Sequence, residues 1–146
     1  MLACPVLGQH GLLFGLQDGH LHAALRHAGL DGLRHGVEQL AAIKESGGLV
    51  GLNFATCILR PDGQKGADTP IELMLRHLDH LIAKLGVEHV GLGSDFDGAH
   101  VPEAIGDVVG LPVLVAAMRQ HGYDETTISR ICHANWIDVL ERSWRP

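Results

Sequence analysis

An apolar run changes abruptly to acidic residues set among glycines in the stretch Val90-Gly91-Leu92-Gly93-Ser94-Asp95-Phe96-Asp97-Gly98. The apolar part, His89 to Gly93, is short and follows a helix-like segment, which is typical of a parallel strand buried on both faces. The acids follow at its carboxyl end, where parallel α/β folds hold their ligands. If strand geometry persists, Asp95 and Asp97 project to one side. An ordinary Asx turn, with Asp95 capping the next segment, explains the same residues equally well.

Composition is that of a single globular domain. The chain has 146 residues, of which 46% are hydrophobic, and a formal net charge of -6. It carries no basic run or aromatic ladder, so we expect neither nucleic acid nor an anionic membrane as a partner. Cys4, Cys57 and Cys132 are odd in number and far apart, which favours reduced thiols and a cytoplasmic location. Met1 to Leu16 is apolar but lacks a basic n-region and is too short to span a bilayer.

From residue 36 onward, the spacing of apolar residues alternates between helical and strand-like. The expected order is a helix over 37–46, a strand over 49–54, a helix over 70–85, a strand over 89–93, and helices over 111–121 and 124–144. Glycines stop the first two helices, and Thr69 is the predicted N-cap of the second. This alternation is typical of right-handed βαβ units and predicts an α/β fold with a parallel sheet.

Histidines form two candidate metal pairs. His20 and His22 lie two apart after an apolar run, so at a strand end they would point the same way and share one ion. The same residues also fit a histidine-bearing helix. His77 and His80 have the i, i+3 spacing of a pair on one helix face.

Two polar positions inside predicted helices favour structural hydrogen bonds. In the helix over 70–85, we favour a buried hydrogen bond from Asp79 or His80 to a loop over metal binding. Asn135 lies on a mostly buried helix, where its amide must find partners, and is predicted to hydrogen-bond from the helix to a loop.

The stretch 89–98 closely resembles the signature of the membrane dipeptidase (renal dipeptidase) family of zinc peptidases. Further segments occur in the family's order and at similar intervals: Glu38 to Phe54, His77 to His80, and Asn135-Trp136 with the Val139-Leu140 that follows. The resemblance divides the chain into a poorly matched N-terminal segment, 1–36, and the C-terminal βα units of a dipeptidase-like barrel, 37–146. It implies the C-terminal part of a (β/α)8 TIM-type barrel.

The resemblance also implies a reaction. Members of the family hydrolyse dipeptides, and a hydroxide that bridges two zinc ions is the nucleophile. The aspartate that matches Asp95 lies beside that water, where a carboxylate can orient it and carry its proton to the leaving amine. Asp95 is therefore the candidate catalytic residue, and Asp97 is expected to hold the loop. Arg34 only neighbours the position expected for a substrate-binding arginine, so no residue is assigned to substrate binding.

The family's metal ligands precede the region that matches. They are a His-x-Asp on the first strand, a bridging Glu and two later histidines, and most have no counterpart here, so no metal ligand is assigned. A full barrel also needs roughly 250 residues. We expect a truncated metallodipeptidase that is inactive alone. Its unpaired strand edges predict a homo-oligomer or poor stability.

Two other functions fit the residues. One is a non-catalytic α/β domain that acts through association with another chain. The other is a different metal-dependent amidohydrolase that uses His20 and His22.

Overall fold

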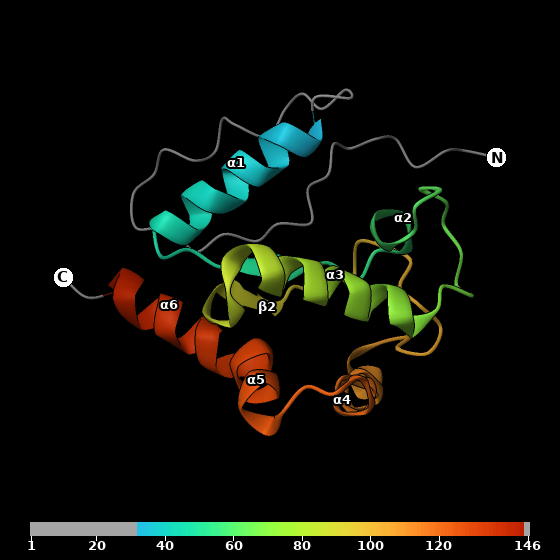
Figure 1. The fold of residues 1–146 in the computed structure, drawn as a ribbon. Coiled ribbons are helices and arrows are strands. Elements are labelled where there is room, and N and C mark those ends of the chain that lie inside the picture. The colour runs from blue at the N-terminus through green and yellow to red at the C-terminus, as the bar shows by residue number, and fades with distance from the viewer. Residues whose placement is uncertain (1–31, 145–146) are drawn as a thin grey trace.

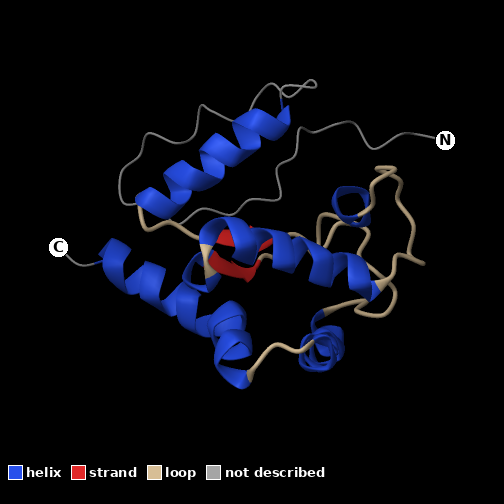
Figure 2. Cartoon of the chain, viewed as in Figure 1, coloured by secondary structure: helices blue, strands red, loops and turns tan. Residues whose placement is uncertain are grey.

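A computed structural model describes residues 32–144 of the chain, with side chains from residue 38 onward. Its elements, in chain order, are α1 (Gly32–Glu45), β1 (Val50–Leu52), α2 (Thr56–Leu59), α3 (Ile71–Leu85), the 3-10 turn η2 (Val87–His89), β2 (Val90–Leu92), the 3-10 turn η3 (Val108–Gly110), α4 (Leu111–His121), α5 (Glu125–Ser129), the π-helical turn η4 (Arg130–Ala134) and α6 (Asn135–Trp144). Figures 1 and 2 show their arrangement. The two strands run parallel, with Val50 opposite Val90 and Leu52 opposite Leu92. The predicted mixture of helices and parallel strands is confirmed.

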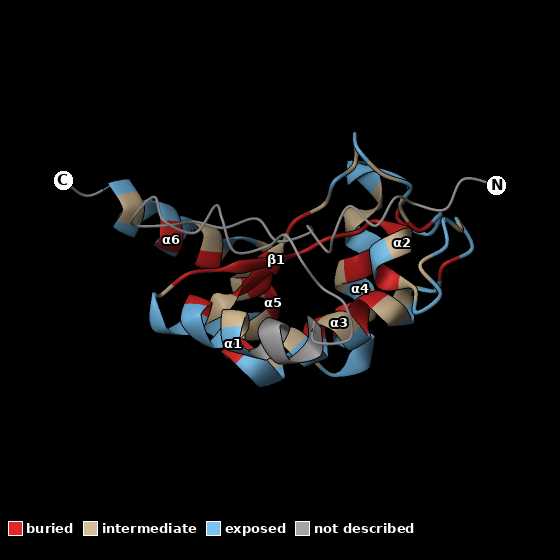
Figure 3. Cartoon of the chain, turned by 90° about the horizontal axis from the view of Figure 1, so that it is seen from above, coloured by how far each residue is buried: buried red, intermediate tan, exposed pale blue. Residues whose placement is uncertain are grey.

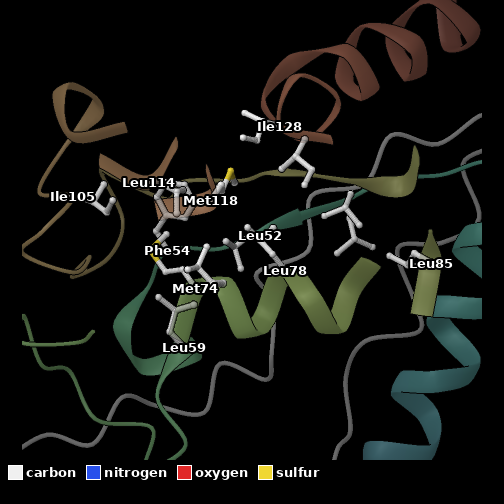
Figure 4. Close-up of a cluster of buried hydrophobic side chains, with 14 of the residues drawn as sticks. Leu52, Phe54, Leu59, Met74, Leu78, Leu85, Ile105, Leu114, Met118 and Ile128 are labelled. Atoms are coloured by element: carbon white, nitrogen blue, oxygen red, sulfur yellow. The ribbon is translucent and has the colours of Figure 1, made fainter. Parts of the chain in front are cut away.

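One face of the small sheet packs against α3. Buried residues recur along this helix at helical spacing: Met74, Leu75, Leu78 and Leu85. They meet the side chains of Val50, Leu52 and Val90 in a single apolar cluster. Figure 4 shows Leu52, Met74 and Leu78 lying together between the strands and the helix, and Figure 3 shows the buried strands beside α1 and α3. The sheet is thus held rigidly from one side, which fixes where its strands end.

The other face of the sheet is lined by glycines. Gly51 pairs with Gly91 across the strands, and the ring of Trp136 lies against both: a Cβ on Gly91 would stand 2.6 Å from its Nε1 atom, and a Cβ on Gly51 would stand 3.5 Å from its Cζ2 atom. The backbones of Gly51 and Gly93 also approach closely, because a Cβ on Gly93 would stand 3.2 Å from the Cα atom of Gly51. Small residues here let the strands and the indole pack in contact.

Side chains of the C-terminal helical segment bind the outer edge of β2. The N–H of Gly93 donates to the carbonyl of Leu52 across the sheet. The backbone N–H and C=O groups of successive residues in a parallel strand face its two neighbours in turn. The backbone groups of Val90 and Leu92 therefore point away from β1. The Asn135 amide donates to the Val90 carbonyl at 2.8 Å, and the Trp136 indole N–H donates to the Leu92 carbonyl at 3.1 Å. The expectation of an unpaired edge is therefore wrong for these two carbonyls.

Helix ends differ in detail from the sequence-based expectation. The N-cap of α3 is Pro70 and makes no side-chain cap bond, while the Thr69 hydroxyl donates to the Gly66 carbonyl. Asp124 does cap α5 by accepting from the Thr127 N–H. The last helix is interrupted by η4, where a π-helical turn shifts the face that meets β2. Within residues 32–144, no helix has both the length and the apolar content needed to cross a membrane.

Candidate active site

The chain segments that leave β1 and β2 stay joined beyond the ends of the strands. The N–H of Phe54 donates to the Ser94 carbonyl at 3.1 Å. The rings of Phe54 and Phe96 meet edge to face with their centroids 5.6 Å apart. Phe54 is fully buried, so this contact anchors the loop after β2 to the core. Polar residues that follow either strand are consequently held side by side.

Asp95 lies in a turn rather than in an extended strand. Strand β2 ends at Leu92, and Asp95 has a φ of 71°, the only positive φ among the non-glycine residues described. Its carbonyl accepts hydrogen bonds from the N–H groups of Gly98 and Ala99. Aspartate tolerates this left-handed conformation better than most residues. The prediction that Asp95 and Asp97 share one side of a strand is wrong, because the strand geometry does not persist.

Asn53 joins the end of β1 to the Asp95 carboxylate. Its amide Nδ2 donates to Asp95 Oδ2 at 3.2 Å, and its Oδ1 accepts from the Ala55 N–H at 2.7 Å. Asn53 is 8% exposed, whereas Asp95 is exposed. Sequence reasoning did not single out Asn53, although an asparagine directly after an apolar strand and level with the acidic loop of the next strand was a usable signal.

Gly98 leaves room for the Asp95 carboxylate. A Cβ at this position would stand 2.5 Å from Asp95 Oδ1. Any side chain here would push the carboxylate away or distort the turn. Asn53 and Gly98 therefore border the two oxygens of one exposed carboxylate. Asp97 is also exposed.

Two polar side chains of α3, His77 and Asp79, make structural contacts. The His77 Nε2 atom donates to the Leu59 carbonyl at 3.1 Å. Asp79 accepts from the Tyr123 hydroxyl at 2.6 Å and from His121 Nε2 at 2.8 Å, which ties α3 to the end of α4. The predicted bond from Asp79 is confirmed, but its predicted burial is wrong, since the side chain is 46% exposed.

These contacts shift the acidity of two groups. Slight burial works against ionisation of Asp79, but the bonds from Tyr123 and His121 prevail and lower the pKa of its carboxyl. Partial burial, together with the bond to the Asp79 carboxylate, raises the pKa of Tyr123. Both shifts belong to a clasp between helices, away from the strand ends.

The described part of the chain does not fit a metal centre. Among residues 32–144, no three side chains of the histidine, cysteine, aspartate or glutamate types gather closely enough to hold an ion. The immediate neighbour of Asp95 is the amide of Asn53, which presents its donor to the carboxylate. His20 and His22, the candidate pair of the sequence analysis, lie outside the described residues.

Residues 37–143 match the model of a known family, the membrane dipeptidases of peptidase family M19. The chain belongs to the membrane dipeptidase family. The resemblance inferred from the stretch 89–98 is thereby confirmed.

Two individual proteins are similar to this chain over most of its length. An uncharacterized protein from the pqqA 5' region of Klebsiella pneumoniae is 46% identical over 108 residues, covering 74% of this chain and 40% of that protein. Dipeptidase tcpJ of Claviceps purpurea is 34% identical over 103 residues, covering 69% of this chain and 23% of its own length. The chain thus spans less than half of the length of these relatives.

Solved structures of the family have the same fold over this region. A dipeptidase of family M19 is 61% identical, with a TM-score of 0.73, over 74% of this chain and 32% of its own. A metallopeptidase of Rhodobacter sphaeroides, bound to a phosphinate mimic of the dipeptide L-Ala-D-Ala, is 60% identical, with a TM-score of 0.73, over 74% of this chain and 31% of its own.

Proposed function

We propose that the chain supplies the proton-carrying part of a dipeptide-hydrolysing site, with Asp95 as the catalytic carboxylate. The observation that carries this proposal is an exposed carboxylate held by a hydrogen bond at the carboxyl ends of two parallel strands. Parallel α/β folds place their reactive groups at this edge. Membership of the dipeptidase family supplies the substrate class.

Hydrolysis of a peptide bond needs a group that accepts a proton from water and then donates it to the leaving amine. The attacking water must lose a proton as its oxygen bonds to the carbonyl carbon, and the amine nitrogen must gain one before the C–N bond breaks. A single carboxylate can accept the first proton and deliver it to the nitrogen. Asp95 is exposed to a substrate, one of its oxygens is held by Asn53, and Gly98 leaves space beside the other.

We further propose that β1 and β2 are two neighbouring strands of a (β/α)8 barrel. The support is their parallel pairing, the helix α3 that connects them, and the likeness to family structures of which this region is about a third. Asp95 would lie at the carboxyl-terminal rim of this barrel.

Two zinc ions are part of this proposal, but at least some of their ligands must come from outside residues 32–144. The described side chains offer no group of three that would hold an ion. We therefore expect the isolated chain to bind less than two equivalents of zinc and to hydrolyse no dipeptide. A measured content of two equivalents, with turnover, would contradict this shortage of ligands.

Zinc content also separates the alternative functions. No bound zinc and no activity in any context would favour a domain that acts by association with another chain. One equivalent that is lost in His20→Ala and His22→Ala variants would favour a different amidohydrolase.

The role of Asp95 is tested by a chimera. Residues 37–144 of this chain would replace the matching third of the 61% identical dipeptidase, and release of alanine from L-Ala-D-Ala would be measured. We expect the chimera to be active and its Asp95→Asn variant to lose about 10²- to 10⁴-fold in kcat. Asp97→Asn is the matched control and should retain activity. Retained activity in Asp95→Asn would show that another group carries the proton.

A further inference from the structure

We infer that Asn53 is the positioning residue of Asp95: it fixes the orientation of the carboxylate without contacting a substrate. The importance of Asn53 for hydrolysis rests on the proposed role of Asp95. The hydrogen bond between the two side chains does not depend on that role. Asn53 is 8% exposed and follows β1 directly, so it projects from the rigid end of the strand. The donor atom Nδ2 lies 3.2 Å from Asp95 Oδ2.

The backbone sets which end of the Asn53 amide faces Asp95. The Ala55 N–H can only donate, and it lies 2.7 Å from Asn53 Oδ1. The oxygen of the amide is therefore held on the side of Ala55, and the NH2 group must point to the carboxylate. A rotation of the amide by half a turn would place two donors against each other at Ala55 and two acceptors against each other at Asp95.

A neutral donor suits a carboxylate that must carry a proton. Arginine or lysine at this place would bind the carboxylate as an ion pair and compete with the proton. An amide restricts the side-chain torsions of Asp95 and leaves most of its lone pairs available. Asp95 is exposed and lies in a turn with a φ of 71°, so a hydrogen bond rather than burial restricts its side chain. Holding a reactive group in one orientation is a main source of catalytic rate.

The strand ends remain joined without the Asn53 side chain. The Phe54 N–H bond to Ser94 and the ring contact between Phe54 and Phe96 both hold the two loops together. Removing the Asn53 amide should therefore release the Asp95 side chain while its backbone stays in place. This separates a positioning role from a purely structural one.

The experiment measures side-chain rotamers of Asp95 by NMR three-bond couplings in the full chain. The variants are Asn53→Ala and Asn53→Ser, because serine retains an oxygen that can accept from the Ala55 N–H. The control is Thr69→Ala, which removes another buried side-chain bond, from Thr69 to the Gly66 carbonyl. We expect one Asp95 χ1 rotamer in the wild type and in Thr69→Ala, and averaging over rotamers in both Asn53 variants.

Either of two results would overturn the inference: averaged Asp95 couplings in the wild type, or a single unchanged rotamer in Asn53→Ser. If Asn53→Ala does not fold, the Asp95 couplings of Asn53→Ser still test the inference. Failure of the proposed function is distinguishable from failure of this inference. If Asp95 is not catalytic, the Asp95→Asn chimera keeps its activity, and the Asp95 couplings of the full chain do not change. In the chimera, Asn53→Ser should lower kcat about 10-fold with KM unchanged, since it affects the reacting group and not substrate binding.

Discussion

Two buried asparagines, Asn53 and Asn135, make opposite use of the same side chain. Asn135 is fully buried, and its Nδ2 donates to the carbonyls of Val87 and Val90 at 2.6 and 2.8 Å. Asn53 is almost as buried, but its Nδ2 donates to a carboxylate that faces solvent. Burial alone does not distinguish a structural amide from one at a site. The distinguishing feature is the partner: backbone carbonyls in the interior, or an exposed charge.

The outer edge of β2 differs in a similar way from the carboxyl ends of the two strands. At the junction between η4 and α6, the side chains of Asn135 and Trp136 donate to backbone carbonyls at the edge of β2. These contacts stabilise the fold. At the carboxyl ends of the strands, Asn53 holds the side chain of an exposed residue, Asp95, whose backbone is in an uncommon conformation. Proteins keep such conformations where the surroundings enforce them, and they cluster at functional sites. The outer edge of β2 thus carries contacts that hold the fold together, and the carboxyl ends of the two strands carry the group that we propose to react.

The largest predicted effect on stability is at the junction between η4 and α6. Asn135→Ala removes both donors and leaves the Val87 and Val90 carbonyls without them, so we expect a loss of about 3 kcal/mol in the free energy of unfolding. Urea denaturation measures it. Ile137→Ala, an exposed position on the same helix, is the control and should change the free energy by about 0.5 kcal/mol or less. An equal loss in both variants would mean that the Asn135 bonds contribute little.

The next effect tests the indole that packs on the glycine-lined face. A Cβ in Gly91→Ala would stand 2.6 Å from Trp136 Nε1, so the ring must move and give up its bond to Leu92. We expect a loss of about 2 kcal/mol and a red-shifted Trp136 fluorescence, measured in a Trp144→Phe background.

The control for that experiment is Gly122→Ala. Gly122 has a φ of 105° and nothing within 4 Å of an added Cβ, so its substitution should cost about 1 kcal/mol through backbone strain alone. The emission of Trp136 should not change. A blue-shifted or unchanged emission in Gly91→Ala would refute the placement of the ring.

A smaller loss of stability is expected at the site end. Asn53→Ser should lower the free energy of unfolding by about 1 kcal/mol, because serine retains an oxygen that can accept from the Ala55 N–H and the exposed Asp95 carboxylate regains water when the amide is lost. Urea denaturation compares it directly with Asn135→Ala. A loss as large as that of Asn135→Ala would assign Asn53 a structural role like that of Asn135.

Much of the fold followed from local patterns in the sequence. Gly86 and Gly122 end α3 and α4 where predicted, and Asp124 caps α5 through its side chain. The role of Asn135 was also predictable, because a buried amide must find partners. Apolar spacing misled in α6, where Ile137 and Leu140 are 50% and 39% exposed. The π-helical turn before α6 changes which residues face the sheet, and periodicity does not reveal it.

The candidate site was less predictable for a physical reason. Asp95 could be chosen from its place after a strand and from the family resemblance, but its conformation depends on contacts with a segment 42 residues away. The pairing of Asn53 with Asp95 requires the parallel register of β1 and β2. Register is a tertiary property that a single sequence specifies only weakly for strands this short.

The smallest effect concerns the clasp between α3 and the end of α4, where Asp79 accepts from Tyr123 and His121. The folded state lowers the pKa of the Asp79 carboxyl, so the clasp stabilises the fold above the ordinary pKa of about 4 and this contribution is lost as pH falls through the lowered value. Tyr123→Phe removes one of the two bonds. The stability difference between wild type and Tyr123→Phe should therefore be fully present at about pH 7 and shrink towards about pH 3. Urea midpoints at both pH values measure it.

The Asp79→Asn background isolates the carboxylate in that experiment. With no ionisable group at position 79, Tyr123→Phe should cost the same at both pH values. The effect will be small, because the side chain of Asp79 is 46% exposed and solvent screens such contacts. A pH-independent difference in the wild-type background would show that Tyr123 acts through packing alone. The clasp would then resemble the Asn135 junction, where Asn135 donates to backbone carbonyls that do not titrate, and not the strand ends, where a charge is held.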